Sequence, residues 1–443
     1  MRKSITIDEN KKYIFPKNIK KVYYKDIFLI ISPETANWII LQNNAQLRFF
    51  ELLKYLDLKS ACKKEDFKKE DIIQVLVQIE AKQFCNTKVL SSTAGKESIH
   101  FYLTNACNLR CPHCYMFSDV KKENELTTEE ICLFLEKYKE NNGHKVVFSG
   151  GEISLRKDLF YICKHAHNIG LKVQLLTNGV LWTSKSIEEI APFIDEVQIS
   201  IDGYSEETNA LIRGKGNFQK ALNSVDLFIK NKVSTEIGIT PFFNEELQSN
   251  YHHYAEFAKS LIQKYRDKIQ VRFAAEMLEG RNVCLTSIEH NEYTDIIHKI
   301  YSVYYEGNMS LYPFVSMRRQ HRIMDNCIFG TLAISSVGDV YMCSRIASVG
   351  SVANIRKDNM DKIMKISSHS KDLSNINNLK PCNICELKYI CGGGCRIDYF
   401  NKLAKSTNIL SLQSKDIPPR KCSIKYKEAF YDLMIETNDL IFQ

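Results

Sequence analysis

The chain has 443 residues, which is enough for two to four domains with a sizeable core. An apolar share of 44% and a charged share of 25% exclude a disordered or fibrous chain and are typical of a globular protein. The net charge of +8 comes from scattered lysines without a basic face interleaved with aromatic residues, which argues against nucleic-acid binding. We interpret these lysines as solvated surface, with attraction of an acidic peptide as the alternative.

No run of about 18 uncharged apolar residues is present, so the sequence predicts no membrane partner and no transmembrane helix. The first residues lead into mixed polar sequence rather than an apolar signal region. We therefore expect a cytoplasmic protein, in which the fifteen cysteines are metal ligands and buried thiols rather than disulfides.

Residues 1–90 are predicted to form a small separate domain. Short β-rich runs come first and two helical patterns follow, at Val22–Tyr24, Phe28–Ile31, Trp38–Leu41, Leu47–Leu56 and Ile72–Ile79. This order resembles the winged-helix leader-peptide recognition domain of peptide-modifying enzymes, which adds an extended leader to an exposed sheet edge. A structural cap on the next domain is the alternative. Residues 86–97, rich in Ser, Thr, Lys and Gly, are expected to be a linker.

From residue 98 to about 310, strands and helices alternate, which predicts an α/β fold with a parallel sheet. The expected strands are Ile99–Leu103, Lys145–Phe148, Lys172–Leu176, Glu196–Ile201, Thr235–Thr240 and Lys268–Phe273. Helices are expected to begin near Thr127, Asp158, Ser184, Asn217, Leu247 and Ile288. Polar motifs follow the first four strands, and in α/β barrels such strand ends form the active site.

The first of these motifs is a cysteine triad with the spacing C-x₃-C-x₂-C, at Cys107, Cys111 and Cys114. Three thiolates on a four-iron cubane leave one iron open to bind a substrate or cofactor. With the aromatic residue His113 before the last cysteine, the motif resembles the signature of radical S-adenosylmethionine (SAM) enzymes. The resemblance implies a partial (β/α)6 TIM barrel over residues 98–310, a [4Fe–4S] cluster on the three catalytic cysteines, and SAM.

The same resemblance assigns residues to SAM. Gly150, Gly151 and Glu152 match the element that reaches the amino group of the methionine moiety, since an ammonium needs a carboxylate and closely approaching carbonyls. Ser200 and Asp202 match the ribose contacts, and Arg213 matches an arginine that grips the methionine carboxylate. The implied cofactor-binding set is His113, Gly150, Gly151, Glu152, Asn178, Ser200, Asp202 and Arg213.

Seven further cysteines lie in the last third of the chain. One tetrahedral zinc would use four of them and two would need eight, so zinc is the poorer account. The pattern resembles the SPASM domain, the auxiliary-cluster extension of peptide-modifying radical SAM enzymes, here at 320–430 and followed by a C-terminal helix at 431–443. The resemblance implies two auxiliary [4Fe–4S] clusters, one on Cys382, Cys385, Cys391 and Cys422 and one on Cys327, Cys343 and Cys395.

Taken together, the resemblance implies an oxidoreductase that cleaves SAM to a 5′-deoxyadenosyl radical and removes hydrogen from a ribosomal precursor peptide with a leader. The implied electron donor is a flavodoxin or ferredoxin. The three-cysteine cluster has no fourth cysteine, and an open iron there would bind a substrate thiolate. The leading interpretation is therefore a maturase that forms intramolecular thioethers from cysteine sulfur to carbon. A backbone group, water or another residue at the fourth position is the alternative.

Three other functions are retained. A maturase of the same class would form carbon–carbon or carbon–oxygen crosslinks. A sulfatase maturase would oxidise cysteine or serine to formylglycine, but that group has an aspartate after the cysteine matching Cys343, where this chain has Ser344. A non-enzymatic zinc-binding regulator built on the N-terminal domain would be colourless and would not cleave SAM. The sequence does not identify the precursor, the residues joined, the stereochemistry or the oligomeric state.

Overall fold

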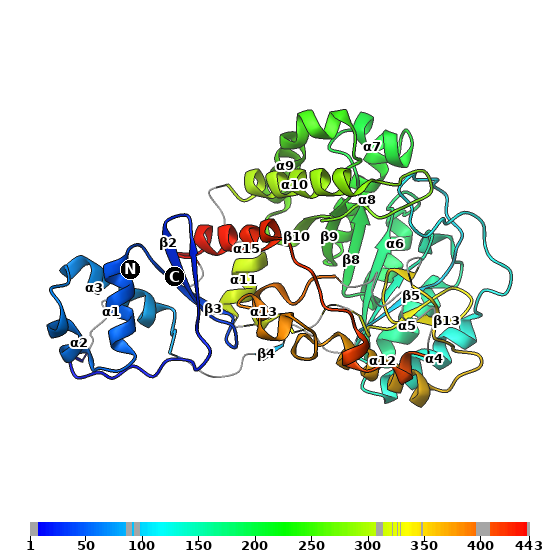
Figure 1. Cartoon of the computed structure of the whole chain (residues 1–443). Coiled ribbons are helices and arrows are strands. Elements are labelled where there is room, and N and C mark those ends of the chain that lie inside the picture. The colour runs from blue at the N-terminus through cyan, green and yellow to red at the C-terminus, as the bar shows by residue number, and fades with distance from the viewer. Residues whose placement is uncertain are drawn as a thin grey trace.

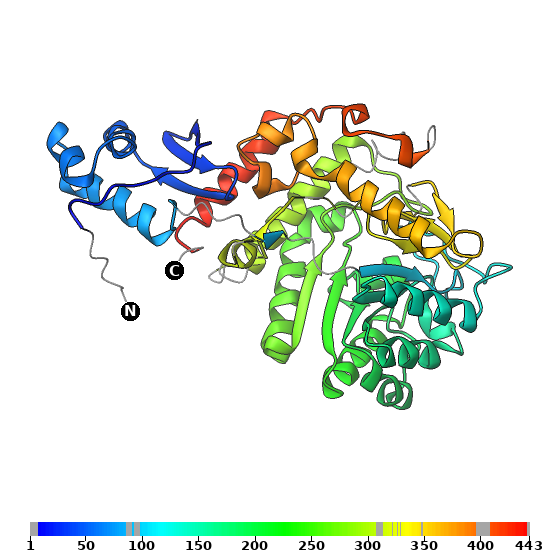
Figure 2. The ribbon, with the colours of Figure 1, turned by 90° about the horizontal axis from the view of Figure 1, so that it is seen from below.

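The structure is a computed structural model that describes residues 8–85, 91–92, 98–306, 313–320, 322–325, 327, 329–346, 349–395 and 408–440. It has a small N-terminal unit beside a larger α/β body (Figures 1 and 2). The predicted linker at 86–97 lies outside the described residues, apart from Ser91–Ser92, which forms the two-residue strand β4 and pairs with β11 (Arg322–Ile323).

The N-terminal unit is an antiparallel sheet followed by three helices. Its strands are β1 (Lys20–Tyr24), β2 (Ile27–Ser32) and β3 (Asn37–Leu41), in that order, and its helices are α1 (Asn44–Leu53), α2 (Leu58–Lys64) and α3 (Lys69–Ala81). Lys25 and Asp26 both have positive φ, which a tight two-residue hairpin requires. The three predicted strands and both helical patterns are present.

The body is organised on one nine-stranded sheet, ordered β10-β9-β8-β7-β6-β5-β12-β13-β14. Six parallel strands form its barrel part: β5 (Ser98–Tyr102), β6 (Lys145–Ser149), β7 (Lys172–Thr177), β8 (Glu196–Ser200), β9 (Ser234–Ile239) and β10 (Ile269–Phe273). Each predicted strand overlaps one of these. The α/β fold expected from the alternation is confirmed.

Helices connect the strands. They are α4 (Thr128–Glu140), α5 (Leu159–Asn168), α6 (Ser184–Ile190), α7 (Glu206–Arg213), α8 (Phe218–Lys230), α9 (Glu245–Tyr265) and α10 (Ser287–Tyr304). The capping box expected at Thr127 is present, with its hydroxyl accepting from the Glu130 amide. The prediction missed α7, a short helix that begins after the cap residue Ser205.

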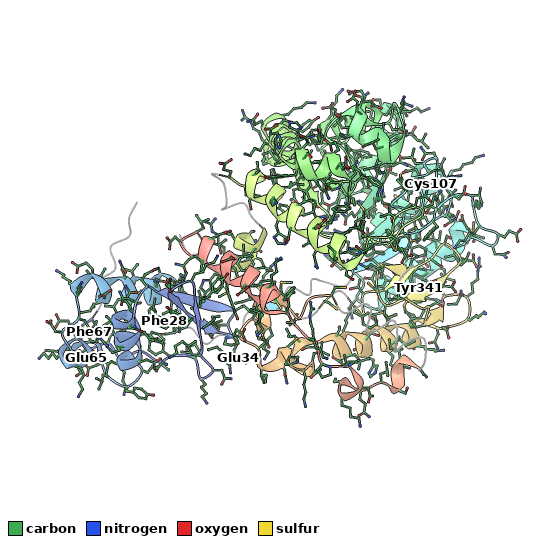
Figure 3. The ribbon with its side chains drawn as sticks, turned by 45° about the horizontal axis from the view of Figure 1, so that its top comes forward. Phe28, Glu34, Glu65, Phe67, Cys107 and Tyr341 are labelled. Carbon is green, nitrogen blue, oxygen red and sulfur yellow. The ribbon has the colours of Figure 1, made fainter. Side chains whose placement is uncertain are left out.

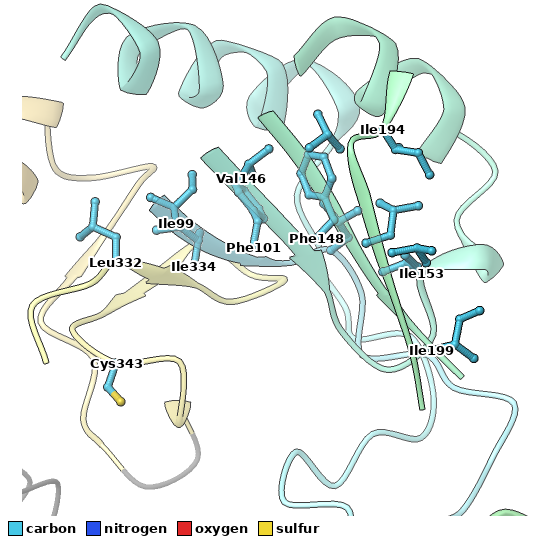
Figure 4. Close-up of a cluster of buried hydrophobic side chains, with 14 of the residues drawn as sticks. Ile99, Phe101, Val146, Phe148, Ile153, Ile194, Ile199, Leu332, Ile334 and Cys343 are labelled. Carbon is cyan, nitrogen blue, oxygen red and sulfur yellow. The ribbon is translucent and has the colours of Figure 1, made fainter. Parts of the chain in front are cut away.

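The sheet continues into the C-terminal part of the chain. Strand β12 (Ala333–Ile334) pairs in parallel with β5, while β13 (Asp339–Tyr341) and β14 (Ala353–Asn354) extend the sheet in antiparallel pairing. Figure 4 shows Leu332 and Ile334 beside Ile99 and Phe101, all in one core cluster. The C-terminal part is therefore built directly onto the first barrel strand.

The remaining helices are α11 (Pro313–Arg319), α12 (Met360–Ser374), α13 (Lys388–Cys391) and α15 (Ile424–Glu436). The C-terminal helix expected at 431–443 begins earlier, at Ile424, because Ser423 accepts a capping hydrogen bond from the Tyr426 amide. It ends at Glu436, before the undescribed residues 441–443. Among the described residues, no helix has the length and apolar character needed to span a bilayer.

A second core cluster joins the N-terminal unit to the C-terminal part. It contains Leu29, Ile31, Trp38 and Ile40 from the N-terminal sheet together with Phe314, Val315, Tyr431 and Met434. The Trp38 indole N–H donates to the Met434 carbonyl at 3.2 Å. Helix α15 thus lies beside the N-terminal sheet, as both ribbon views show (Figures 1 and 2).

Candidate active site

The cysteine triad lies on the loop that follows β5. The loop is closed on itself because the Cys107 amide donates to the Asp119 carbonyl at 3.0 Å and the Asp119 amide donates to the Asn105 carbonyl at 3.0 Å. Arg110 fastens it further, donating to the Cys107 carbonyl at 2.9 Å and to the Asp119 carboxylate. Backbone pairing therefore sets the shape of the loop that carries the thiols. In Figure 3, Cys107 lies at the end of the molecule away from the N-terminal unit.

The glycine pair after β6 allows the cysteine loop to approach. The Gly151 amide donates to the Thr104 carbonyl at 2.8 Å, and the next amide, that of Glu152, donates to the Ala106 carbonyl at 2.8 Å. A Cβ atom on Gly151 would stand 2.2 Å from the Ala106 oxygen, and one on Gly150 would stand 2.5 Å from the Thr104 oxygen. Only glycine permits this contact.

Glu152 ties the ends of two strands together. Its buried carboxylate accepts from the Thr177 hydroxyl at 2.7 Å, the Asn178 amide at 2.8 Å and the Ser154 hydroxyl at 2.7 Å. Asn178 in turn donates from its side chain to Asn108 in the cysteine loop at 2.9 Å. Oε1 accepts from the Thr177 hydroxyl and from both the hydroxyl and the amide of Ser154, whereas Oε2 accepts from the Asn178 amide and retains capacity for a further donor.

Asp202 and Arg213 form a buried ion pair. Asp202 is 1% exposed, and its Oδ2 accepts from Arg213 Nε at 2.7 Å while its Oδ1 accepts from the Thr240 amide at 2.8 Å. His113 Nε2 stands 3.4 Å from the same carboxylate. Burial lowers the pKa of His113 against the opposing pull of Asp202, so the imidazole is neutral at pH 7. Its Nδ1 is buried without a hydrogen-bond partner.

These motifs surround one cavity of about 320 Å³. Of the residues assigned from the sequence, those that line it are Cys107, Cys111, His113, Cys114, Gly150, Gly151, Asn178, Ser200 and Arg213. Glu152 and Asp202 do not line it but stand behind the residues that do, through the hydrogen bonds given above. The structure therefore distinguishes residues that line the cavity from Glu152 and Asp202, which support them. The sequence motifs do not make this distinction.

The donor set around the cavity suits an iron–sulfur cluster better than a single ion. In the described residues, no three His, Cys, Asp or Glu side chains are arranged to hold one metal ion. Three thiols on one wall of a cavity, with electrostatic interactions of Cys107 with Cys111 and Cys114, fit the larger cubane. Burial raises the pKa of Cys107 to about 11, so loading a cluster there must release protons.

The auxiliary cysteines fall into two groups near two arginines. Electrostatic interactions link Cys391 with Cys382 and Cys422, and all three with Arg420. Cys385 interacts with Lys427, which also interacts with Cys422. A cation beside each cysteine set compensates the negative charge that thiolates or a cluster would bring.

The second group contains Cys343 and Cys395, which interact with each other and with Arg345. Cys343 is buried at the start of the loop after β13, below the core side chains in Figure 4. Cys327 packs against the main core. Cys343 and Cys395 are two of the three cysteines expected to share a cluster, and that assignment stays a prediction.

Some polar residues of the cavity wall carry no motif, and the sequence did not point to them. Glu276 and Tyr115 line the cavity, and Glu276 forms a 2.7 Å ion pair with Arg345. Tyr115 stands 3.2 Å, oxygen to oxygen, from Tyr102, whose hydroxyl donates to the Ser344 carbonyl. These contacts join the cavity wall to the auxiliary cysteine loop. For Glu276, the only signal in the sequence was its position just after the last barrel strand, β10.

Comparison with known proteins agrees with this geometry. Residues 101–256 match the radical SAM superfamily. The AdoMet-dependent heme synthase of Methanosarcina barkeri is 28% identical over 70% of this chain and 93% of its own length. The PqqA peptide cyclase of Bradyrhizobium diazoefficiens is 25% identical over 69% of this chain and 83% of its own length.

One solved structure extends the likeness to almost the whole fold. Streptococcus suis SuiB bound to S-adenosylmethionine is 15% identical, with a TM-score of 0.50, and the superposition covers 92% of this chain and 99% of that one. At this identity the likeness is one of fold, and it includes both the partial barrel and the regions on either side of it.

Proposed function

Because this chain is a radical SAM enzyme related both to SPASM-type peptide maturases and to heme synthase, we propose that it matures a ribosomally made peptide. The bond formed is an intramolecular thioether from cysteine sulfur to a carbon. The observation that carries the proposal is the single cavity on which the three cysteines, the glycine pair and Arg213 converge. When bound, the cluster and SAM supply a radical that removes hydrogen from carbon.

The residues of the chain have separate tasks. Cys107, Cys111 and Cys114 hold the cluster, and Gly150 and Gly151 bring backbone groups close to the cofactor. Arg213 binds the methionine carboxylate with the guanidinium edge that Asp202 leaves free, since Asp202 engages Nε. The wall of the cavity orients the reacting carbon.

A peptide substrate is favoured by the N-terminal unit. Its edge strand β1 is largely exposed, with Lys20, Lys21 and Tyr23 on the surface, and offers backbone groups to an extended leader. The auxiliary cysteines near Arg345 and Arg420 supply two further clusters, one of which binds the substrate sulfur or accepts the electron left on the product. The electron donor is a flavodoxin or ferredoxin, and the enzyme works in the cytoplasm.

Heme synthesis is the second candidate, because the heme synthase aligns over nearly its full length. That alignment leaves almost a third of this chain without a counterpart, which favours a substrate that needs an additional docking unit. A carbon–carbon or carbon–oxygen crosslink is the alternative within the peptide class.

The first experiment is anaerobic reconstitution with iron and sulfide, followed by addition of SAM and dithionite. We expect about twelve irons per chain and formation of 5′-deoxyadenosine. Replacing Cys107, Cys111 and Cys114 together with Ala should remove about four irons and abolish SAM cleavage. Cys163→Ala is the matched control, because Cys163 is a core thiol with no exposed surface. Unchanged iron in the triple variant would refute the cluster assignment.

The second experiment distinguishes the substrates. The reconstituted enzyme is incubated with SAM and either the short peptide encoded beside its gene or an iron porphyrin. A peptide product two mass units lighter, resistant to thiol alkylation at one cysteine, supports thioether formation. The same mass change with all cysteines alkylated indicates a carbon–carbon or carbon–oxygen crosslink. Turnover of the porphyrin alone would overturn the peptide assignment.

A further inference from the structure

Arg318 is a buried guanidinium that has no hydrogen-bond partner among the residues that the structure describes. It lies near the end of α11, its residue is 4% exposed, and Nε and both terminal nitrogens have no hydrogen-bond partner. Burial lowers its pKa to about 10, so it remains charged at pH 7. An unpaired buried charge costs several kcal/mol, and an arginine cannot avoid that cost by losing its proton at neutral pH.

The other buried cations of the described residues are satisfied. Lys82 donates to the Asn438 side chain, and Lys388 forms a 3.3 Å ion pair with Glu34. The exposed neighbour Arg319 donates to the Leu440 carbonyl at 2.7 Å and 3.1 Å. Among the described residues, Arg318 is thus the buried lysine or arginine that lacks both a hydrogen bond and an ion pair.

The surroundings of Arg318 are aromatic and cationic. Its guanidinium carbon stands 5.6 Å from the centre of the Phe314 ring, which lies 6.0 Å from the Trp38 ring, and Lys82 Nζ lies 5.7 Å from the same indole. Two cations therefore flank two neighbouring aromatic side chains, whose rings are tilted by 33°. This series crosses the joint between the N-terminal sheet, α11 and α15.

We infer that Arg318 is the receptor of an oxyanion at this joint, a carboxylate or phosphate group held by the planar fork of the guanidinium. Carboxylate and phosphate are the ligands whose geometry matches two parallel N–H donors. The oxyanion comes either from an acidic side chain of a bound peptide or from a free anion in solution. The inference does not depend on SAM cleavage or on the proposed peptide chemistry.

The test is thermal unfolding of the full chain at constant ionic strength, with chloride replaced stepwise by inorganic phosphate. At about 100 times the dissociation constant, phosphate should raise the unfolding midpoint by about 3 °C. The variant Arg318→Met should show no such rise. Arg319→Met is the matched control and should respond like the native protein, because its guanidinium lies on the surface.

Without added anion, Arg318→Met should unfold at a higher temperature than the native protein, because an unpaired buried charge has been removed. If that variant does not fold, Arg318→Lys takes its place, and its response to phosphate should be at most half the native one, since it keeps the charge but loses the fork. A lower midpoint for Arg318→Met without anion, or the same anion response in every variant, would overturn the inference.

A second titration distinguishes the two sources of the oxyanion, a peptide carboxylate and a free anion. A blocked synthetic peptide, Glu-Val-Glu-Val-Glu, is titrated in place of phosphate, with Gln-Val-Gln-Val-Gln as the neutral control. A rise with the Glu peptide alone assigns the site to a peptide carboxylate. A rise with phosphate alone assigns it to a free anion. No rise with either in the native protein refutes an oxyanion site.

Discussion

Asp202 determines how Arg213 faces the cavity. The carboxylate is buried, engages the guanidinium Nε and is itself fixed by the Thr240 amide, so the two terminal nitrogens of Arg213 remain for a ligand. Sequence motifs alone assigned Asp202 to the ribose, although in the structure its side chain stands behind the cavity wall. We therefore propose that Asp202 acts toward SAM by positioning Arg213.

The first prediction concerns this ion pair. Asp202→Asn should weaken SAM binding about tenfold, because Arg213 loses its orientation and a buried charge loses its partner. Equilibrium binding of SAM to the reconstituted enzyme measures the effect. Asp226→Asn breaks an exposed pair with Lys264 and serves as the control, with unchanged affinity expected. Equal affinities in all three proteins would contradict the positioning role.

A second prediction tests the contact beneath the cysteine loop. Gly151→Ala should displace that loop, because the new methyl group would meet the Ala106 carbonyl oxygen at 2.2 Å. We expect about four fewer irons after reconstitution, with the remaining clusters retained. Gly216→Ala is the control, because no atom lies within 4 Å of the Cβ that it would add, and its iron content should not change although φ at Gly216 is positive.

At the residue scale, spacing predicted candidate ligands but not the residues that support them. The C-x₃-C-x₂-C spacing and the Gly-Gly-Glu run are local signals, so they could be found from the chain alone. The pairing of Glu276 with Arg345 joins residues on separate elements and has no local signature. Which oxygen of Glu152 remains available likewise depends on Thr177 and Asn178, from a different strand.

At the scale of the elements, Arg156 anchors the turn after β6 because it binds both a backbone carbonyl and a carboxylate. Arg156 donates to the Leu103 carbonyl at 2.8 Å and binds the Asp158 carboxylate with Nε at 2.8 Å and a terminal nitrogen at 2.6 Å. Asp158 also accepts from the Thr128 hydroxyl at the start of α4. The ion pair between Arg156 and Asp158 therefore connects the turn after β6 to the end of β5 and to the start of α4.

The third prediction is the pH dependence of this anchor. Hydrogen bonds from Arg156 lower the pKa of Asp158 to about 2, below its value near 4 in an unfolded chain. The carboxylate thus stabilises the fold fully above pH 4 and progressively less as the pH falls toward 2. Asp158→Asn should lower the unfolding free energy by about 2 kcal/mol at pH 7. Denaturant titrations should show that the difference between the two proteins shrinks between pH 4 and pH 2.

At the edge of β3, the side chain of Gln78 forms the two hydrogen bonds that a neighbouring strand would form. The Gln78 side-chain amide accepts from the Ile40 N–H at 2.8 Å and donates to the Ile40 carbonyl. Beside it on α3, Ile73 and Val77 are 47% and 44% exposed. A peptide adding at this edge would exchange the two hydrogen bonds for equivalent ones and cover the apolar pair.

The fourth prediction follows from that competition. If a leader adds along β3, Gln78→Ala should raise its affinity about fivefold, because a competitor worth about 1 kcal/mol is removed. Fluorescence anisotropy of a labelled precursor measures it. Gln74→Ala, one turn away on α3, is the control. Unchanged affinity for Gln78→Ala would direct the leader to the open edge β1.

Element prediction succeeded where the signal was local. Short β-rich runs located the N-terminal strands, and the alternation of strand-like and helical stretches located those of the barrel part. The helix expected near Thr127 is α4, which begins with a capping box at that residue. Helix α7 was missed because its eight residues include two charged ones at its start and lie between two loops. The C-terminal helix was expected too late because its first turn, Ile424–Lys427, carries an exposed isoleucine and lysines that do not read as an apolar face.

For the whole molecule, the important property is the shared core between the N-terminal unit and α15. Trp38 has no exposed surface and bonds to the Met434 carbonyl, while Lys25 binds Asp432 at 2.5 Å. Contacts between residues so far apart in the chain leave no trace in composition or periodicity. The sequence therefore predicted three regions, but it did not predict that α15 of the C-terminal region packs against the N-terminal sheet.

The fifth prediction addresses this joint. Trp38→Ala should release α15 from the N-terminal sheet and destabilise the protein by about 3–5 kcal/mol. Hydrogen exchange should show faster exchange at the α15 amides. SAM cleavage with dithionite should persist, because the cysteine loop lies at the other end of the molecule, whereas modification of a full-length precursor should fall. Tyr55→Ala, at an exposed site of the same unit, should leave both activities unchanged.

The pairing of β12 with β5 also has a consequence for biosynthesis. Strand β5 leaves the ribosome early, with β6 to β10 following, but its second neighbour is made only after the whole barrel part has been synthesised. Until then one edge of the nascent sheet is open to pairing with other chains. Emergence of β12 from the ribosome, rather than completion of the barrel strands, is the step that covers this edge, so slow translation between β10 and β12 should favour aggregation.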